Sequence, residues 1–309
     1  MSVCSYGAAI VSLEVPNRDG QKIDVVLGFD KAEHYVQSID LPAPPHFGAA
    51  IGRYAGRIGR GLLNFDGREI QLRPNSHGHT LHGGRWGYSQ RVWTVTGFDK
   101  NSFIELTLNS PDGDENFPGT LDVRVRYELA GMSLRVLFTA DVRDDTVLNL
   151  TQHSYFNLDG HMHTVAGQKV CVRSDAVLET LHMVPTGKIL AAEDMAMNLS
   201  EMRMVPHEID ATFVLNREEG PAAQLVSAKT GISLEVHTNQ PSVHVYVGGN
   251  CFGQIPGKNG ASYHAQSGIC FETQNYPDAP NHPHFPSAVV RAGETYRHET
   301  TFQFKNIDP

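Results

Sequence analysis

The stretch that decides the fold is Asp122-Val-Arg-Val-Arg-Tyr-Glu-Leu129, in which every second residue is apolar. A turn at Ala130-Gly-Met132 leads into a second alternating run, from Leu134 to Ala140. A strand alternates in this way when one of its faces packs on a core and the other meets water. The two runs therefore predict an antiparallel pair of strands within a sandwich that has one wet face.

Similar patterns lie on both sides of this pair. The alternating residues around Asp66-Gly67 predict a β-hairpin, because Asp-Gly suits a two-residue turn. Later strands are expected over residues 232–236, 243–247 and 296–304. The run from Lys188 to Val205 contains neither Gly nor Pro, so it is the one good place for a longer helix, although a structured excursion fits equally well. Without a repeat or a linker, we expect a single domain over residues 1–309.

Composition and charge exclude several classes of protein. The chain has 309 residues and a formal net charge of -9, with no basic stripe, which argues against nucleic-acid binding. No apolar run approaches the ~18 residues that a membrane span needs, and the first residues lack the pattern of a signal peptide. The cysteines are far apart and typical of free thiols in a reducing compartment. We therefore expect a cytoplasmic protein with no nucleic-acid or membrane partner.

One segment carries the best candidate for chemistry, Gly268-Ile-Cys-Phe-Glu-Thr-Gln-Asn-Tyr-Pro-Asp-Ala-Pro-Asn281. It begins as a strand in which Glu272 points away from Ile269 and Phe271, and its prolines and asparagines then impose a fixed turn. A carboxylate held in this way is well placed for proton transfer, although many strand glutamates are only solvated. His153 lies in another β-rich segment. Taken alone, it is as compatible with a buried structural histidine as with a catalytic one.

Two Gly- and His-rich segments come earlier in the chain. Gly52-Arg-Tyr-Ala-Gly-Arg-Ile-Gly-Arg-Gly61 is either an irregular loop or a backbone that approaches a ligand while Arg53 or Arg57 points into a pocket. The segment from Asn75 to Gly84 contains several close histidines, but their spacing matches no familiar zinc motif. We therefore predict hydrogen-bonding histidines and no metal.

Taken together, these motifs resemble the aldose 1-epimerase (galactose mutarotase) family over almost the whole chain. The matching segments are Gly52–Ile58, Leu81–Gly84, His153–Leu158, Ile209–Phe213, Thr238–Pro241 and Phe271–Asn281. The resemblance implies an all-β fold, a large antiparallel β-supersandwich with few short helices and a sugar cleft on one sheet face. It also implies chemistry without a cofactor or metal.

The resemblance further implies a reaction, the interconversion of the α and β anomers of free aldoses by ring opening and closing. In it Glu272 is the general base and His153 the general acid, which we expect to be protonated and on the opposite side of the sugar from Glu272. The residues that match sugar-binding positions are Arg57, His82, Asp210 and Gln240. The expected partner is a monosaccharide, and the expected assembly is a monomer or a homodimer.

The chain departs from the family pattern at a few places. Gly56 stands where the family usually has Asn, Arg85-Trp-Gly-Tyr-Ser89 is atypical, and the chain starts late, as if lacking a first strand or hairpin. Two alternative functions stay open: action on a sugar phosphate or an unusual sugar, and sugar binding without catalysis. The first needs extra cations, for which the candidates are Arg53, Arg57 and Arg85. The other histidines are expected to be structural: His77, His79, His161, His163 and His244.

Overall fold

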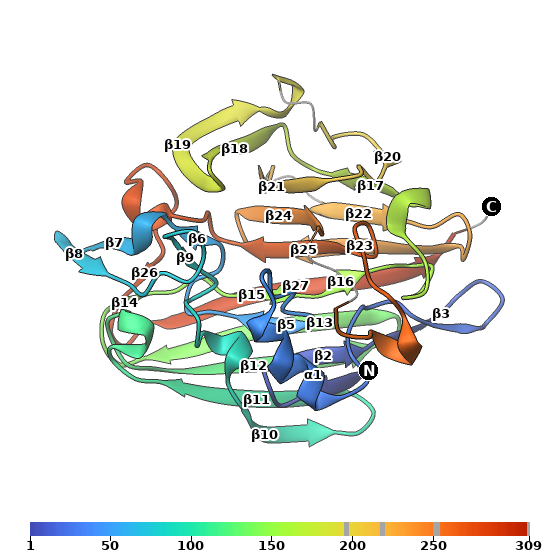
Figure 1. Cartoon of the computed structure of the whole chain (residues 1–309), viewed down its shortest axis with the longest axis horizontal. Coiled ribbons are helices and arrows are strands. Elements are labelled where there is room, and N and C mark those ends of the chain that lie inside the picture. The colour runs from blue at the N-terminus through green and yellow to red at the C-terminus, as the bar shows by residue number, and fades with distance from the viewer. Residues whose placement is uncertain (195–197, 217–219, 250–253, 308–309) are drawn as a thin grey trace.

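Antiparallel β-structure dominates the computed structural model of the chain, which describes residues 1–194, 198–216, 220–249 and 254–307. The strands form a nine-stranded sheet, a six-stranded sheet and several two-stranded pairs (Figure 1). The predicted all-β sandwich is therefore confirmed.

The nine-stranded sheet is built around the hairpin that the alternating sequence predicted. Val125 pairs with Phe138, and Tyr127 with Val136, in an unbroken antiparallel register. The strands in spatial order are β10 (Thr94–Asp99), β11 (Phe103–Ser110), β12 (Leu121–Ala130), β13 (Ser133–Val142), β27 (Thr295–Asn306), β23 (Ile232–Thr238), β22 (Ala223–Val226), β17 (Lys169–Val172) and β20 (Arg203–Met204).

The six-stranded sheet is the second large layer. Its strands in spatial order are β16 (Tyr155–Phe156), β25 (Ile269–Gln274), β24 (Ser242–Val247), β21 (Ile209–Val214), β18 (Ala176–Leu181) and β19 (Val184–Ala191). The β18–β19 hairpin forms one edge of this sheet and lies at the top of the view in Figure 1.

Short pairs, one α-helix and several short 3₁₀-helices complete the described structure. The hairpin at Asp66-Gly67 is confirmed, since Phe65 pairs with Arg68. The pairs are β1 (Ser2–Cys4) with β2 (Ala9–Ser12), β3 (Glu14–Pro16) with β4 (Lys22–Asp24), β5 (Ala49–Ile51) with β15 (Thr151–His153), β6 (Arg57–Ile58) with β9 (Thr80–Leu81), β7 (Leu62–Phe65) with β8 (Arg68–Gln71), and β14 (Thr146–Val147) with β26 (Val289–Val290). Within the described ranges α1 (Ala32–Gln37) is the only α-helix, and no helix there is both long and apolar enough to cross a membrane.

A helix between Lys188 and Val205 was one of two alternatives for that run, and it is wrong. The first part of the run belongs to β19, in which Leu190 pairs with Val177 of β18, and a later part is β20. Pairing with a neighbouring strand satisfies backbone groups that a helix would have satisfied internally, so tertiary context overrides helix propensity here. Residues 195–197 of this run lie outside the described residues.

The main core lies between the two large sheets. The ring centroid of Phe156 on β16 is 4.9 Å from that of Phe302 on β27, and Phe213 and Phe271 are fully buried in the same cluster. Because strand side chains alternate between faces, the neighbours of these core residues on β21, β24 and β25 point away from the core. Asp210, His244 and Glu272 therefore share the outer face of the six-stranded sheet.

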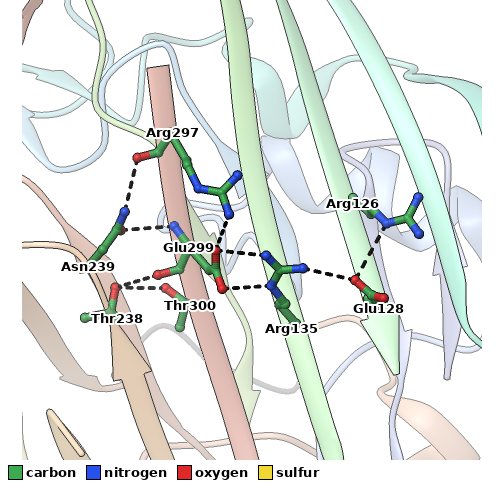
Figure 2. A network of polar contacts seen from close by, with 8 residues as sticks. All are labelled: Arg126, Glu128, Arg135, Thr238, Asn239, Arg297, Glu299 and Thr300. Atoms are coloured by element: carbon green, nitrogen blue, oxygen red, sulfur yellow. Dashed lines mark hydrogen bonds and ion pairs between the residues drawn. The ribbon is translucent and has the colours of Figure 1, made fainter. Parts of the chain in front are cut away.

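A polar network on the nine-stranded sheet fixes the turn that follows β23 (Figure 2). Arg135 donates to Glu299 through Nε at 2.8 Å and through Nη2 at 3.0 Å. The backbone N–H of Glu299 donates to Asn239 Oδ1 at 3.0 Å, and the Thr238 and Thr300 hydroxyls are 3.1 Å apart. These contacts hold the turn against β27.

Candidate active site

A cleft of about 460 Å³ lies over the outer face of the six-stranded sheet. This volume is within the ~300–1,000 Å³ of typical small-molecule sites. Its polar lining includes His46, Arg57, His82, His153, Asp210, Thr212, His244, Tyr246, Glu272 and Gln274. A second cavity of about 650 Å³ is larger, but its described lining contains no histidine and no carboxylate. The cleft is therefore the candidate active site.

Glu272 and His153 are in direct contact at the floor of the cleft. Glu272 Oε1 is 3.4 Å from His153 Nε2, and the two side chains are only 3% and 4% exposed. The Thr151 hydroxyl donates to the Thr273 carbonyl at 2.8 Å, which ties β15 to β25 and brings His153 beside Glu272. This arrangement differs from the expected one, in which the two groups face each other across a sugar.

Burial determines where protons lie in this pair. It raises the pKa of Glu272 to about 7, against the lowering effect of the nearby His244 and Arg57 charges. Burial, with a smaller contribution from the adjacent His46, lowers the pKa of His153 to about 3. Between about pH 3 and pH 7 the pair therefore holds one proton, carried by Glu272 and facing the Nε2 of a neutral imidazole. The expected imidazolium at His153 is not the resting form.

His82 faces the same contact from the loop after β9. The Gly56 N–H donates to His82 Nδ1 at 3.2 Å, and burial holds the pKa of His82 well below its ordinary value. The neutral ring therefore carries its proton on Nε2. His82, His153 and Glu272 have ligand atoms within 4.8 Å of one another, but a metal at His82 Nε2 would have to displace that proton. The chemistry of these groups favours a hydrogen-bond donor at His82 over a metal ligand.

A second ion pair lies beside Glu272. His244 Nε2 is 3.2 Å from Asp210 Oδ1, and His244 Nδ1 is 2.9 Å from the Thr212 hydroxyl. Burial alone would lower the pKa of His244, but the hydrogen bond and charge of Asp210 raise it. Burial alone would raise the pKa of Asp210, but His244 and Arg57 together lower it. The structure thus places His244 in the cleft, although the sequence suggested a structural histidine.

Several buried polar atoms of the cleft have no hydrogen-bond partner within the described residues. They are Arg57 Nε, Glu272 Oε2 and Gln274 Oε1. Buried polar groups in folded proteins are nearly always satisfied by protein, water or ligand. A ligand rich in hydroxyls can supply both the acceptor and the donors that these atoms need.

The structure brings together Arg57, His82, His153, Asp210 and Glu272, all of which the sequence suggested. It does not bring Gln240 to them, because Gln240 lines the second cavity and its amide donates to Asn239 Oδ1 at 2.9 Å. The polar cleft residues that sequence reasoning missed include His46, Thr212, His244, Tyr246 and Gln274, and His77, which was expected to be structural, also lines the cleft.

The missed residues differ in how far the sequence could have revealed them. His244 and Gln274 had a usable signal, since each alternates with core residues on a strand beside Glu272. His46 had none, because it lies in an irregular loop after several prolines.

The suggested cations do not all reach the cleft. Arg53 is buried elsewhere and donates to the carbonyls of Pro118 and Gly119, both at 2.7 Å. Arg85 lines the mouth of the cleft and pairs with Asp40 at 2.8 Å. Arg57 is therefore the only one of the three that lies among the polar groups of the floor.

The chain also matches known proteins over nearly its whole length. The aldose 1-epimerase family model matches residues 1–303. The chain is 39% identical to the galactose mutarotase of Bos taurus over 316 residues, which cover 98% of this chain and 90% of that protein. It is 30% identical to the aldose 1-epimerase of Escherichia coli K12 over 325 residues, covering 98% of this chain and 91% of the relative.

Solved structures give the same result. An aldose epimerase homologue from C. elegans superposes with a TM-score of 0.92 at 28% identity, covering 99% of this chain and 95% of the homologue. A galactose 1-epimerase from Lactobacillus acidophilus superposes with a TM-score of 0.84 at 25% identity, covering 99% of this chain and 91% of the other. The chain belongs to the aldose 1-epimerase family.

Proposed function

We propose that the chain is an aldose 1-epimerase, an isomerase that interconverts the α and β anomers of a free aldose. Glu272 acts as general base and His153 as general acid. The observation that carries the proposal is the buried contact of 3.4 Å between Glu272 Oε1 and His153 Nε2 on the cleft floor. Family membership and the 39% identity to a galactose mutarotase support the same reaction.

The reaction needs one base and one acid acting together. The Glu272 carboxylate removes the proton of the C1 hydroxyl while the ring oxygen takes a proton from His153, so the bond between C1 and the ring oxygen breaks. The C1–C2 bond of the open aldehyde then rotates by about half a turn. On closure the ring oxygen returns its proton to His153 and Glu272 returns its proton to the C1 oxygen, which restores the pair. Each such group typically contributes ~10²–10⁴-fold to the rate.

The pair holds the single proton that this scheme requires. Neutral His153 beside a protonated Glu272 and an imidazolium beside a carboxylate differ only in the position of that proton. Because the pKa of Glu272 is about 7 and that of His153 is about 3, the proton rests on Glu272 in the free cleft, and the arrangement of carboxylate and imidazolium is the higher in energy. A bound sugar that stabilises the carboxylate through its hydroxyls favours the catalytic arrangement.

Other cleft residues bind and orient the sugar in this proposal. Arg57 donates from its unpartnered Nε, His82 donates from Nε2, and Asp210 accepts from hydroxyls. Gln240 is left out because it lines the second cavity. The substrate is a small free monosaccharide, and the protein works without a cofactor or metal, as a monomer or homodimer. A cytoplasmic location is also proposed, supported by free thiols at Cys4, Cys171 and Cys270.

Polarimetry tests the proposal directly. Freshly dissolved α-D-glucose, α-D-galactose and α-D-xylose are followed with and without protein in dilute buffer, and we expect a faster approach to the same final rotation. Glu272→Gln is expected to lower the rate by ~10²–10⁴-fold, because the amide cannot take a proton. Folded wild-type protein that accelerates none of the three sugars would contradict the proposal. Faster turnover of a hexose 6-phosphate than of free hexose would favour the sugar-phosphate alternative.

A further inference from the structure

The pair of His244 and Asp210 is not needed for the two proton transfers, yet it is built into the same face as Glu272. Thr212, His244 and Glu272 are directly opposite one another on β21, β24 and β25. Directly opposed residues of an antiparallel sheet have Cβ atoms only ~5 Å apart. The His244 side chain therefore lies beside Glu272 on the cleft side of the sheet.

Both nitrogens of the His244 ring are fixed. Nε2 faces Asp210 Oδ1 at 3.2 Å, and Nδ1 faces the Thr212 hydroxyl at 2.9 Å. An imidazolium can donate from both nitrogens at once, to the carboxylate and to the hydroxyl oxygen. The ring is largely buried, with 19% of its side chain exposed, so its charge acts on its neighbours with little screening.

The charges around His244 show what that imidazolium does. The titratable and charged groups that face it come from several elements: Asp210, Glu272, Arg57, His82 and His153. His82 and His153 are neutral near pH 7, because burial lowers the pKa of each. With both carboxylates ionised and His244 neutral, Arg57 alone would face two negative charges. With His244 protonated, the two negative charges meet two positive ones.

We propose that His244, paired with Asp210, is a positioning residue that supplies a fixed positive charge beside Glu272 and thereby keeps this carboxylate available as the base. The inference rests on the proposed role of Glu272 in mutarotation. His244 acts through Glu272 and exchanges no proton with the sugar. Its effect is greatest below pH 7, where Glu272 carries the proton and the charge of His244 favours transfer of that proton to His153.

The test is the pH profile of kcat/KM for α-D-galactose in wild type and His244→Gln. Gln keeps hydrogen-bonding groups but carries no charge. A neighbouring opposite charge shifts a carboxyl pKa by ~1–3 units, so without that charge Glu272 holds its proton more tightly, and the alkaline limb that its ionisation sets is expected to move at least ~1 pH unit higher. At pH 6 the rate then falls roughly tenfold, and near pH 8.5 it falls much less. His237→Gln is the matched control, since His237 pairs with Glu235 at 3.3 Å on the other sheet, and it leaves the limb in place.

A double variant separates charge from structure. Asp210→Asn with His244→Gln removes one negative and one positive charge together, so its alkaline limb should return toward the wild-type pH, although the KM is changed. An alkaline limb of His244→Gln that coincides with that of wild type, with only the KM raised, would overturn the proposal and leave His244 as a sugar contact. Wild-type protein that accelerates no sugar would instead contradict the proposed function itself.

A measurement on wild-type protein does not depend on a variant that folds. The ¹⁵N chemical shifts of the His244 ring are expected to be those of an imidazolium at pH 6, since Asp210 raises the pKa of His244 above its ordinary value of 6.5. A neutral ring at pH 6 would overturn the proposal. Mutarotation measured on the same sample would show whether the proposed function still holds.

Discussion

Replacing Glu272 by Gln should make the protein more stable at alkaline pH. The carboxyl group is buried, with its side chain only 3% exposed, and burial raises its pKa from an ordinary value of 4.5 to about 7. A raised pKa means that the folded chain binds this proton more tightly than the unfolded chain does. The stabilisation is fully present below pH 4.5 and is lost as the pH rises through 7. Above pH 7 wild type folds around an ionised, buried carboxylate.

The size of the effect follows from the pKa difference. Each unit corresponds to ~1.4 kcal/mol, so ionised Glu272 lowers the free energy of unfolding by about 3 kcal/mol above pH 7. Roughly 2.5 kcal/mol of this develops between pH 5 and pH 8. The amide of Glu272→Gln does not titrate, and its N–H can donate to His153 Nε2 where Glu272 Oε1 now lies at 3.4 Å. Its advantage over wild type should therefore grow with pH.

Urea unfolding of both proteins at pH 5 and pH 8 measures this difference. Groups outside the cleft titrate alike in the two proteins, so the change in the stability difference between the two pH values reports Glu272 and the cleft groups coupled to it. Glu14→Gln is the control, because the Glu14 side chain is 52% exposed and its pairing with Lys22 is worth less than ~1 kcal/mol. A difference between wild type and Glu272→Gln that is the same at both pH values would refute the reasoning.

Two further substitutions test the placement of residues. Gln240→Ala should leave kcat and KM for α-D-galactose within about twofold of wild type, since Gln240 lines the second cavity; a large rise in KM would return it to the sugar site. Arg53→Lys should lower the free energy of unfolding by ~2–4 kcal/mol, because an ammonium group cannot reproduce the fork that serves the carbonyls of Pro118 and Gly119 and the Ser110 hydroxyl. An unchanged thermal midpoint in Arg53→Lys would contradict that structural role.

Alternation in the sequence predicted part of the two large sheets, including β12, β13, β23, β24 and β27. The β12–β13 pair and the hairpin at Asp66-Gly67 were both readable, because local pattern and turn chemistry agree there. The structure of the run after Lys188 could not be predicted from the sequence. Pairing with β18 determines it, and no local pattern indicates that pairing. That the chain forms one domain stays a prediction.

The site was only partly readable for a related reason. Motifs identified Glu272 and His153, but not that their side chains touch, because β15 and β25 are far apart in sequence and meet through tertiary packing. Gln240 was predicted as a sugar-binding residue from a motif, but that motif ends in a turn that lines the second cavity. The charge on His244 depends on Asp210 across two paired strands, which a linear pattern does not report.

The register of β21, β24 and β25 has a consequence for how such a protein can change. Asp210, His244 and Glu272 lie on one face, while Phe213, Val245 and Phe271 lie on the other, in the core. A substitution on one face therefore changes contacts with a different set of residues than a substitution on the other face does. Substitutions on the cleft side can change sugar preference while the residues on the core side stay the same. A single substitution can therefore alter specificity without preventing the chain from folding.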